Sequence, residues 1–149
     1  MVRLVWRCCT ISSEYGVYVN LDDALREGMS MDGALGIAIV DYESGFTLAK
    51  QGGSSLLDLD VAGPALAEVV RAKLRAIETL QLDDDIEDIL VTLGAHYHII
   101  MPTEARGHGG SFTAGQRQTL FLYLVLDRSR GNLALARRHL RGIERRVRS

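Results

Sequence analysis

The chain has 149 residues, a length that suits one domain with a single buried core. Its hydrophobic fraction of 47% is ordinary for a globular protein and argues against global disorder. The formal net charge of -2 gives no overall attraction to nucleic acid. Cys8 and Cys9 are adjacent, so they provide neither a disulfide framework nor a metal-binding spacing. No apolar run approaches the roughly 18–20 residues of a membrane-spanning helix. We expect a cytoplasmic protein without membrane insertion and without a cofactor.

The first elements in the chain are a short helix and a hairpin. A helix is predicted at Leu21–Met29, with Asn20 as its N-cap and acidic residues in its first turn. Leu35–Val40 is apolar on both faces, which is typical of a central strand covered on both sides. The turn residues Asp41–Gly45 then predict that Phe46–Lys50 returns antiparallel to it.

A long helix is predicted from about Leu59 to Leu80, with Pro64 in its first turn. Helical periodicity places an apolar stripe on one side: Leu66, Val69, Val70, Leu74 and Ile77. The opposite stripe is charged: Glu68, Arg71, Arg75 and Glu78. Small residues lie between the two stripes: Ala65, Ala72 and Ala76. Such a strip lets a second helix approach closely, and it is equally consistent with the high helix propensity of alanine.

Two further strands are predicted after the acidic turn at Asp83–Asp85. Ile86–Leu93 and His96–Met101 have the pattern of a hairpin around Gly94–Ala95. The residues from Thr103 to Gln118 include four glycines and are predicted to form a loop.

The last two elements are a second central strand and a basic helix. Leu120–Leu126 is apolar on both faces, so we expect it beside Leu35–Val40 in the middle of the sheet. We expect Phe46–Lys50 and Ile86–Leu93 at the two edges. A final amphipathic helix is predicted at about Asn132–Arg146.

Two histidines are the strongest candidates for chemistry. His96 and His98 alternate on one strand, so their side chains share a face, and Glu104 is near in sequence. A third ligand at useful spacing is missing, and Cys8 has no positioned base. We favour a solvent-facing polar strand, with a small-ligand or metal-binding enzyme domain using His96, His98 and Cys8 as the alternative.

The C-terminal helix is rich in arginine. Because no aromatic residue is interleaved for base stacking, a nucleic-acid partner is not expected. An arginine-rich solvent face, or an acidic protein partner, agrees better with the pattern. The residues concerned are Arg130, Arg137, Arg138, Arg141, Arg145, Arg146 and Arg148.

The amino-acid sequence of several segments resembles the roadblock/dynein-light-chain family, in particular its bacterial branch. The similarity lies in Leu35–Asp41 with the turn that follows, in the long helix, and above all in Leu120–Arg128 running into Asn132–Arg137. It covers about Leu21 to Val147. The resemblance implies one domain at 20–149 preceded by an N-terminal arm at 1–19. The arm and the long glycine-rich loop are departures from the family pattern.

The resemblance implies an α/β (α+β) fold: a roadblock/profilin-like five-stranded antiparallel sheet sandwiched by helices, in a dimer. It implies a non-enzymatic regulator or scaffold for a small Ras-like GTPase, and stimulation of GTP hydrolysis is left open. Family members pair through the long helix and the edge strand after it, so the expected dimer contacts are Ala65, Ala72, Ala76 and Ile86. The expected partner-docking residues are Glu68, Arg71, Arg75 and Glu78.

Overall fold

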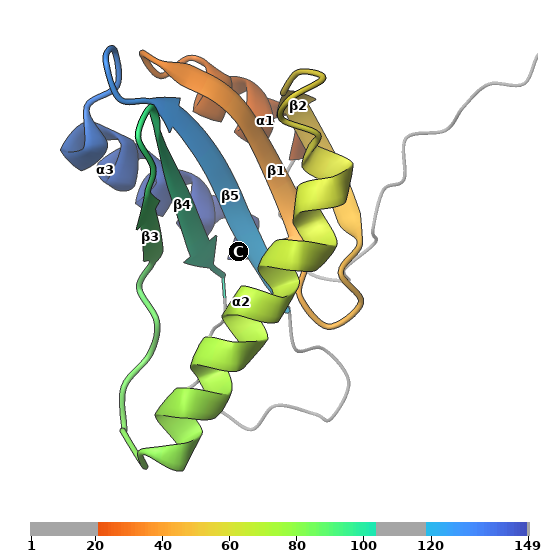
Figure 1. The fold of residues 1–149 in the computed structure, drawn as a ribbon, viewed down its shortest axis with the longest axis vertical. Coiled ribbons are helices and arrows are strands. Elements are labelled where there is room, and N and C mark those ends of the chain that lie inside the picture. Colours follow the sequence, from red (N-terminus) through yellow and green to blue (C-terminus); the bar gives the residue numbers. More distant parts are fainter. Residues whose placement is uncertain (1–20, 104–118, 149) are drawn as a thin grey trace, which may run out of the picture.

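The computed structural model describes residues 21–103 and 119–148; the predicted arm at 1–19 and nearly all of the glycine-rich loop lie outside them. The order of elements agrees with the predicted one (Figure 1). Their bounds are α1 (Leu21–Met29), β1 (Ala34–Asp41), β2 (Thr47–Gly52), α2 (Leu59–Thr79), β3 (Ile89–Thr92), β4 (His96–Pro102), β5 (Leu120–Asp127) and α3 (Leu133–Arg148).

The five strands form one antiparallel sheet in the order β2-β1-β5-β4-β3. The two strands that are apolar on both faces, β1 and β5, are adjacent near the centre, and β2 and β3 are the edges, as predicted. Helix α2 crosses one face of the sheet, and α1 and α3 cover the other (Figure 1). Both faces of the central strands are therefore removed from water.

The alternating side chains of β5 divide the core into two layers. Its leucines, including the fully buried Leu122 and Leu124, face α1 and α3. Phe121, Tyr123 and Val125 face α2. Full burial of one such side chain stabilises the fold by about 1.5–3 kcal/mol.

The strand bounds at the sheet edges differ from the predicted ones. Strand β2 begins at Thr47, and Phe46 is 72% exposed. Strand β3 begins only at Ile89, so the expected strand from Ile86 is wrong over its first residues. Ile86 lies in the connector before β3, where the next two residues form ion pairs with α3. These ion pairs direct the connector toward α3 instead of along β4.

Helix α2 begins after Asp58, whose carboxylate accepts hydrogen bonds from the amides of Asp60 and Val61. This start puts Pro64 in the second turn, so its predicted place in the first turn is wrong. Val69 is 40% exposed and does not belong to the core stripe. The error arises because Val69 lies at the margin of the apolar stripe, where periodicity alone does not separate core from surface.

Candidate functional site

The exposed side of α2 carries a second apolar stripe. It consists of the residues Val61, Ala65, Val69, Ala72 and Ala76, spaced at i, i+4, i+8, i+11 and i+15. Val61 is 70% exposed, Ala65 and Ala72 are exposed, and Ala76 is half-buried. We call this set the α2 stripe. Its small side chains give the helix a smooth surface that permits close approach of another helix.

The charged residues of α2 are less uniform than the sequence suggested. Glu68, Arg75 and Glu78 are exposed, as predicted. Arg71 is half-buried: its guanidinium donates to the carbonyl oxygens of Tyr42 (2.7 Å) and Glu43 (3.0 Å) and forms an ion pair with Glu68. Arg71 thus fastens α2 to the β1–β2 turn and is less accessible than the other three charged residues.

Helix α2 is held toward one side of the sheet. Asp60 forms an ion pair with Lys50 of β2, and Thr47 donates to the carbonyl of Leu59 at 3.5 Å. With the Arg71 contacts, these interactions keep α2 over β1 and β2. Strands β4 and β3 continue the same face of the sheet beyond the opposite flank of the helix (Figure 1).

His96 and His98 lie on this continuing part of the face, with ring centroids 6.2 Å apart. The expected sharing of one strand face is confirmed, but both rings are half-buried and not fully solvent-facing. The Nδ1 atom of His98 is 2.8 Å from the hydroxyl of Tyr123. Burial, and then the neighbouring His96, lower the pKa of His98 below its usual 6.5. Burial raises the pKa of Tyr123 to about 12.

The alternative metal or ligand chemistry gains no support from these side chains. Cys8 and Glu104 lie outside the described residues. Within 21–103 and 119–148, no group of three or more histidine, cysteine and acidic residues is arranged to hold a metal ion.

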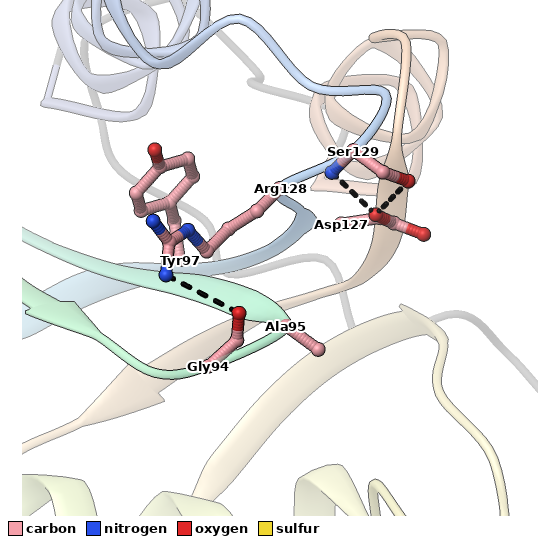
Figure 2. A pocket seen from close by; sticks show the side chains of 6 residues that line it. All are labelled: Gly94, Ala95, Tyr97, Asp127, Arg128 and Ser129. Carbon is pink, nitrogen blue, oxygen red and sulfur yellow. Dashed lines mark hydrogen bonds between the residues drawn. The ribbon is translucent and has the colours of Figure 1, made fainter.

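A pocket lies between the β3–β4 turn and the start of the β5–α3 loop (Figure 2). Arg128 lies over the ring of Tyr97, 5.2 Å from its centroid, and donates to the carbonyls of Leu93 (2.7 Å) and Gly94 (3.2 Å). The carboxylate of Asp127 accepts from the amide and hydroxyl of Ser129. These bonds join the hairpin to the loop, so the pocket's polar groups are already used within the chain.

The basic face of α3 is partly neutralised by the chain itself. Arg137 and Arg141 each pair at 2.6 Å with the connector before β3, through Asp88 and Glu87 respectively. Arg146 pairs with Glu27 of α1. Several of the C-terminal arginines thus have acidic partners within the fold, which weakens the case for an acidic protein partner at this helix.

Sequence reasoning missed two features that the structure brings to this site. Val61 and Val69 extend the predicted alanine strip, because they lie on the same side of the helix. A helical-wheel plot that begins after the Asp58 N-cap would have found them. The contact of His98 with Tyr123 depends on the pairing of β4 with β5, which places residues 25 positions apart side by side. No local pattern encodes that pairing.

These elements define an α+β protein with the roadblock fold, and the comparisons with solved structures agree. A Roadblock/LC7 domain from Streptomyces avermitilis matches with a TM-score of 0.66 and 14% identity, over 87% of this chain and 96% of that one. An MglB structure described as having a tetrameric arrangement matches with a TM-score of 0.66 and 18% identity, over 90% of each chain. The gliding protein MglB from Thermus thermophilus matches with a TM-score of 0.65 and 16% identity, over 93% of this chain and 96% of that one.

The likeness is one of fold. The sequence matches no protein-family model, and no curated protein matches it. None of the helices in the described parts of the chain is long and apolar enough to cross a membrane.

Proposed function

We propose that this protein is a non-enzymatic, cytoplasmic regulator that forms a homodimer and binds a small Ras-like GTPase. The observation that carries the proposal is the α2 stripe, an exposed apolar surface on the longest helix of a roadblock fold. A helix in contact only with its own sheet has no need of apolar residues on its outer side. The bacterial roadblock resemblance supports the GTPase as partner.

The dimer would form through the α2 stripe, including Ala65, Ala72 and Ala76, with Ile86 at its margin. Symmetric contact of two copies places the same surface of each subunit against the other. The free edge of β3, which is four residues long, lies on the same side of the molecule as the flank of α2 that faces β4. A second copy would cover both features at once.

The partner would dock on the charged part of α2, through Glu68, Arg75 and Glu78. Arg71 is better described as a positioning residue, since its guanidinium is bound to the β1–β2 turn. Exposed charges of mixed sign set orientation and association rate more than affinity. The surface thus provides partner selection without catalytic groups.

The dimer is tested by Ala72→Arg, with Ala134→Arg on exposed α3 as the matched control. A guanidinium placed in the stripe would lose its hydration without gaining a partner, so we expect Ala72→Arg to be monomeric by multi-angle light scattering. The control should stay dimeric. A natural protein that is monomeric at micromolar concentration contradicts the proposal.

The partner site is tested by the double reversal Arg75→Glu with Glu78→Arg. Binding of a purified, nucleotide-loaded small Ras-like GTPase from the same source is measured by calorimetry. We expect the double variant to lose binding while its fold and dimerisation are kept, because exposed charges contribute little to stability. Arg138→Glu, on the other face of the sheet, should bind normally. Unchanged binding by the double variant places the docking surface elsewhere.

A further inference from the structure

The part of the sheet face beside α2 combines apolar side chains with two histidines. His98 is paired in register with Val91 of β3 and Val125 of β5. Val91 is 38% exposed, whereas Val125 is fully buried. The Nε2 atom of His98 is enclosed and has no hydrogen-bond partner among the described residues. A half-buried imidazole with one unpaired nitrogen is therefore located beside Val91, an apolar side chain that is partly exposed near the free edge of the sheet.

The pairing with Tyr123 favours a neutral His98. The hydroxyl of Tyr123 keeps its proton, so it can donate to Nδ1, and the remaining proton of the neutral ring then lies on Nε2. A charged ring would have to reverse the bond to Tyr123 and would still have an unpaired N–H at Nε2. Enclosing a charged donor without a partner is costly.

The ionisable groups around His98, within the described parts of the chain, supply no adjacent negative charge. His96 follows on the same strand face, and its positive form would repel a charged His98. Asp127 is the register partner of His96, and its carboxylate interacts electrostatically with that ring, so this negative charge lies next to His96 and not next to His98. Strand β3 has no ionisable residue between Ile89 and Thr92. On α2, Lys73 has the helical phase of the flank toward this part of the sheet, and it would add positive charge.

A second copy is the occupant that agrees best with this surface. The histidine-bearing part of the sheet lies between α2, which packs over β1 and β2, and the free edge of β3. A two-fold contact that uses both the α2 stripe and the β3 edge would therefore also cover the histidines. We propose that His98, with His96 beside it, makes this self-association pH-dependent. The inference rests on the dimer in the proposed function. Two neutral rings would pack in the contact, whereas two charged rings would lose water and repel each other.

The direction of the effect follows from the sign of the shift. The pKa of His98 is lowered in the folded chain, so the neutral form prevails above the ordinary value of 6.5. Self-association should be strongest where His98 is neutral and should weaken as the pH falls through the lowered pKa of His98.

The test is the dimer dissociation constant by sedimentation equilibrium, measured from about pH 7.5 down to the lowest pH at which circular dichroism shows the fold intact. We expect a loss of about tenfold in affinity at the lower end of this range, which corresponds to one pKa unit. His98→Gln should remove most of that loss. His139→Gln, on the exposed side of α3, is the matched control and should keep it.

A second variant provides an independent check if His98→Gln does not fold. His96→Gln removes the neighbouring positive charge that helps to lower the pKa of His98, so that pKa should rise and the midpoint of dissociation should move to higher pH. An unmoved midpoint in that variant overturns the proposal. So does full pH dependence in His98→Gln, or loss of the fold itself before association weakens.

The outcomes also separate this inference from the proposed function. A dimer of equal affinity across the pH range overturns the pH dependence and leaves the proposed dimer standing. A monomer at the upper end of the range overturns both.

Discussion

The guanidinium of Arg71, in the middle of α2, donates a 2.7 Å hydrogen bond to the backbone carbonyl of Tyr42. A second bond of 3.0 Å runs to the carbonyl of Glu43, so one side chain satisfies two acceptors of the β1–β2 turn. The turn is fixed from its other side by Asp41, which accepts from the hydroxyls of Ser44 and Thr119 at 2.6 Å each. The proposed binding helix and the centre of the sheet are thereby coupled through a surface turn.

Replacing Arg71 by alanine should lower the free energy of unfolding by about 1.5–3 kcal/mol, the usual value for hydrogen bonds from a charged donor. Arg75→Ala, one turn further along and exposed, should change it by less than about 0.5 kcal/mol. Urea denaturation of both variants measures the difference. Equal stabilities would show that the turn holds its position without Arg71.

Asp41 should make stability depend on pH in the acid range. Burial alone would raise the pKa of this carboxyl, but hydrogen bonds from the side chains of Ser44 and Thr119 and from two backbone amides hold it below 3.8. A lowered folded-state pKa gives stability that is present above the unfolded value and is lost as the pH falls through the folded value. Asp41→Asn should therefore be less stable than the natural protein at neutral pH, by about 1 kcal/mol.

The same difference should begin to shrink as the pH falls below 3.8, where the unfolded chain takes up the proton first, and should be lost below the lowered folded-state value. Denaturation curves of the two proteins across the acid range provide the measurement. Asp32→Asn is the control, because the side chain of Asp32 is 91% exposed. A constant gap between Asp41→Asn and the natural protein would contradict the assignment.

Two glycines within helices should respond oppositely to alanine. A Cβ on Gly63 would lie 2.5 Å from the hydroxyl oxygen of Thr47 and 3.4 Å from the carbonyl oxygen of Gly45, so Thr47 or α2 would have to shift. At Gly142 a Cβ would meet no heavy atom within 4 Å. Gly142→Ala should thus stabilise the protein by about 0.5–1 kcal/mol through helix propensity. Gly63→Ala should destabilise it despite the same propensity gain, as thermal unfolding would reveal.

Arg137 should be essential for the position of β3. Its partner Asp88 has a side chain only 7% exposed, so Arg137→Ala would leave a carboxylate nearly buried without its cation. We expect a loss of about 1–3 kcal/mol and faster amide exchange in β3. Arg138→Ala, the exposed neighbour, should leave exchange in β3 unchanged. Exchange that stays slow in the Arg137 variant would show that the ladder with β4 is sufficient.

Strands whose own residues show that both faces are buried were predicted well. Leu35–Val40 and Leu120–Leu126 are apolar on both faces, and only a central position in the sheet satisfies such strands. Boundaries failed where tertiary contacts decide them. Just before the start of β3, Asp88 forms an ion pair with Arg137, which lies 49 residues further along the chain, and no local pattern predicts this contact.

The position of the candidate site on α2 was predicted from the sequence, but the contacts of its individual residues were not. In the alanine strip on α2, Ala65 and Ala72 are exposed and Ala76 is half-buried, and the roles of these residues in a dimer stay predictions. Arg71 is indistinguishable from Arg75 in sequence, because helical phase does not show that the β1–β2 turn presents two carbonyls beside one of them. The alternation of His96 and His98 on one strand face could be predicted from the sequence. Their partial burial and the hydrogen bond to Tyr123 could not, because both depend on the pairing of β4 with β5.

The pairing of β1 with β5 has a consequence for synthesis of the chain. Strand β1 ends at Asp41, whereas its central partner begins at Leu120. During translation, Ile37 and Ile39 therefore leave the ribosome long before the strand that covers one edge of β1 exists. Pairings so distant along the chain form slowly and leave apolar edges open to other chains in the meantime. The nascent protein is most vulnerable to aggregation between these two events, so chaperone binding should be concentrated in that interval.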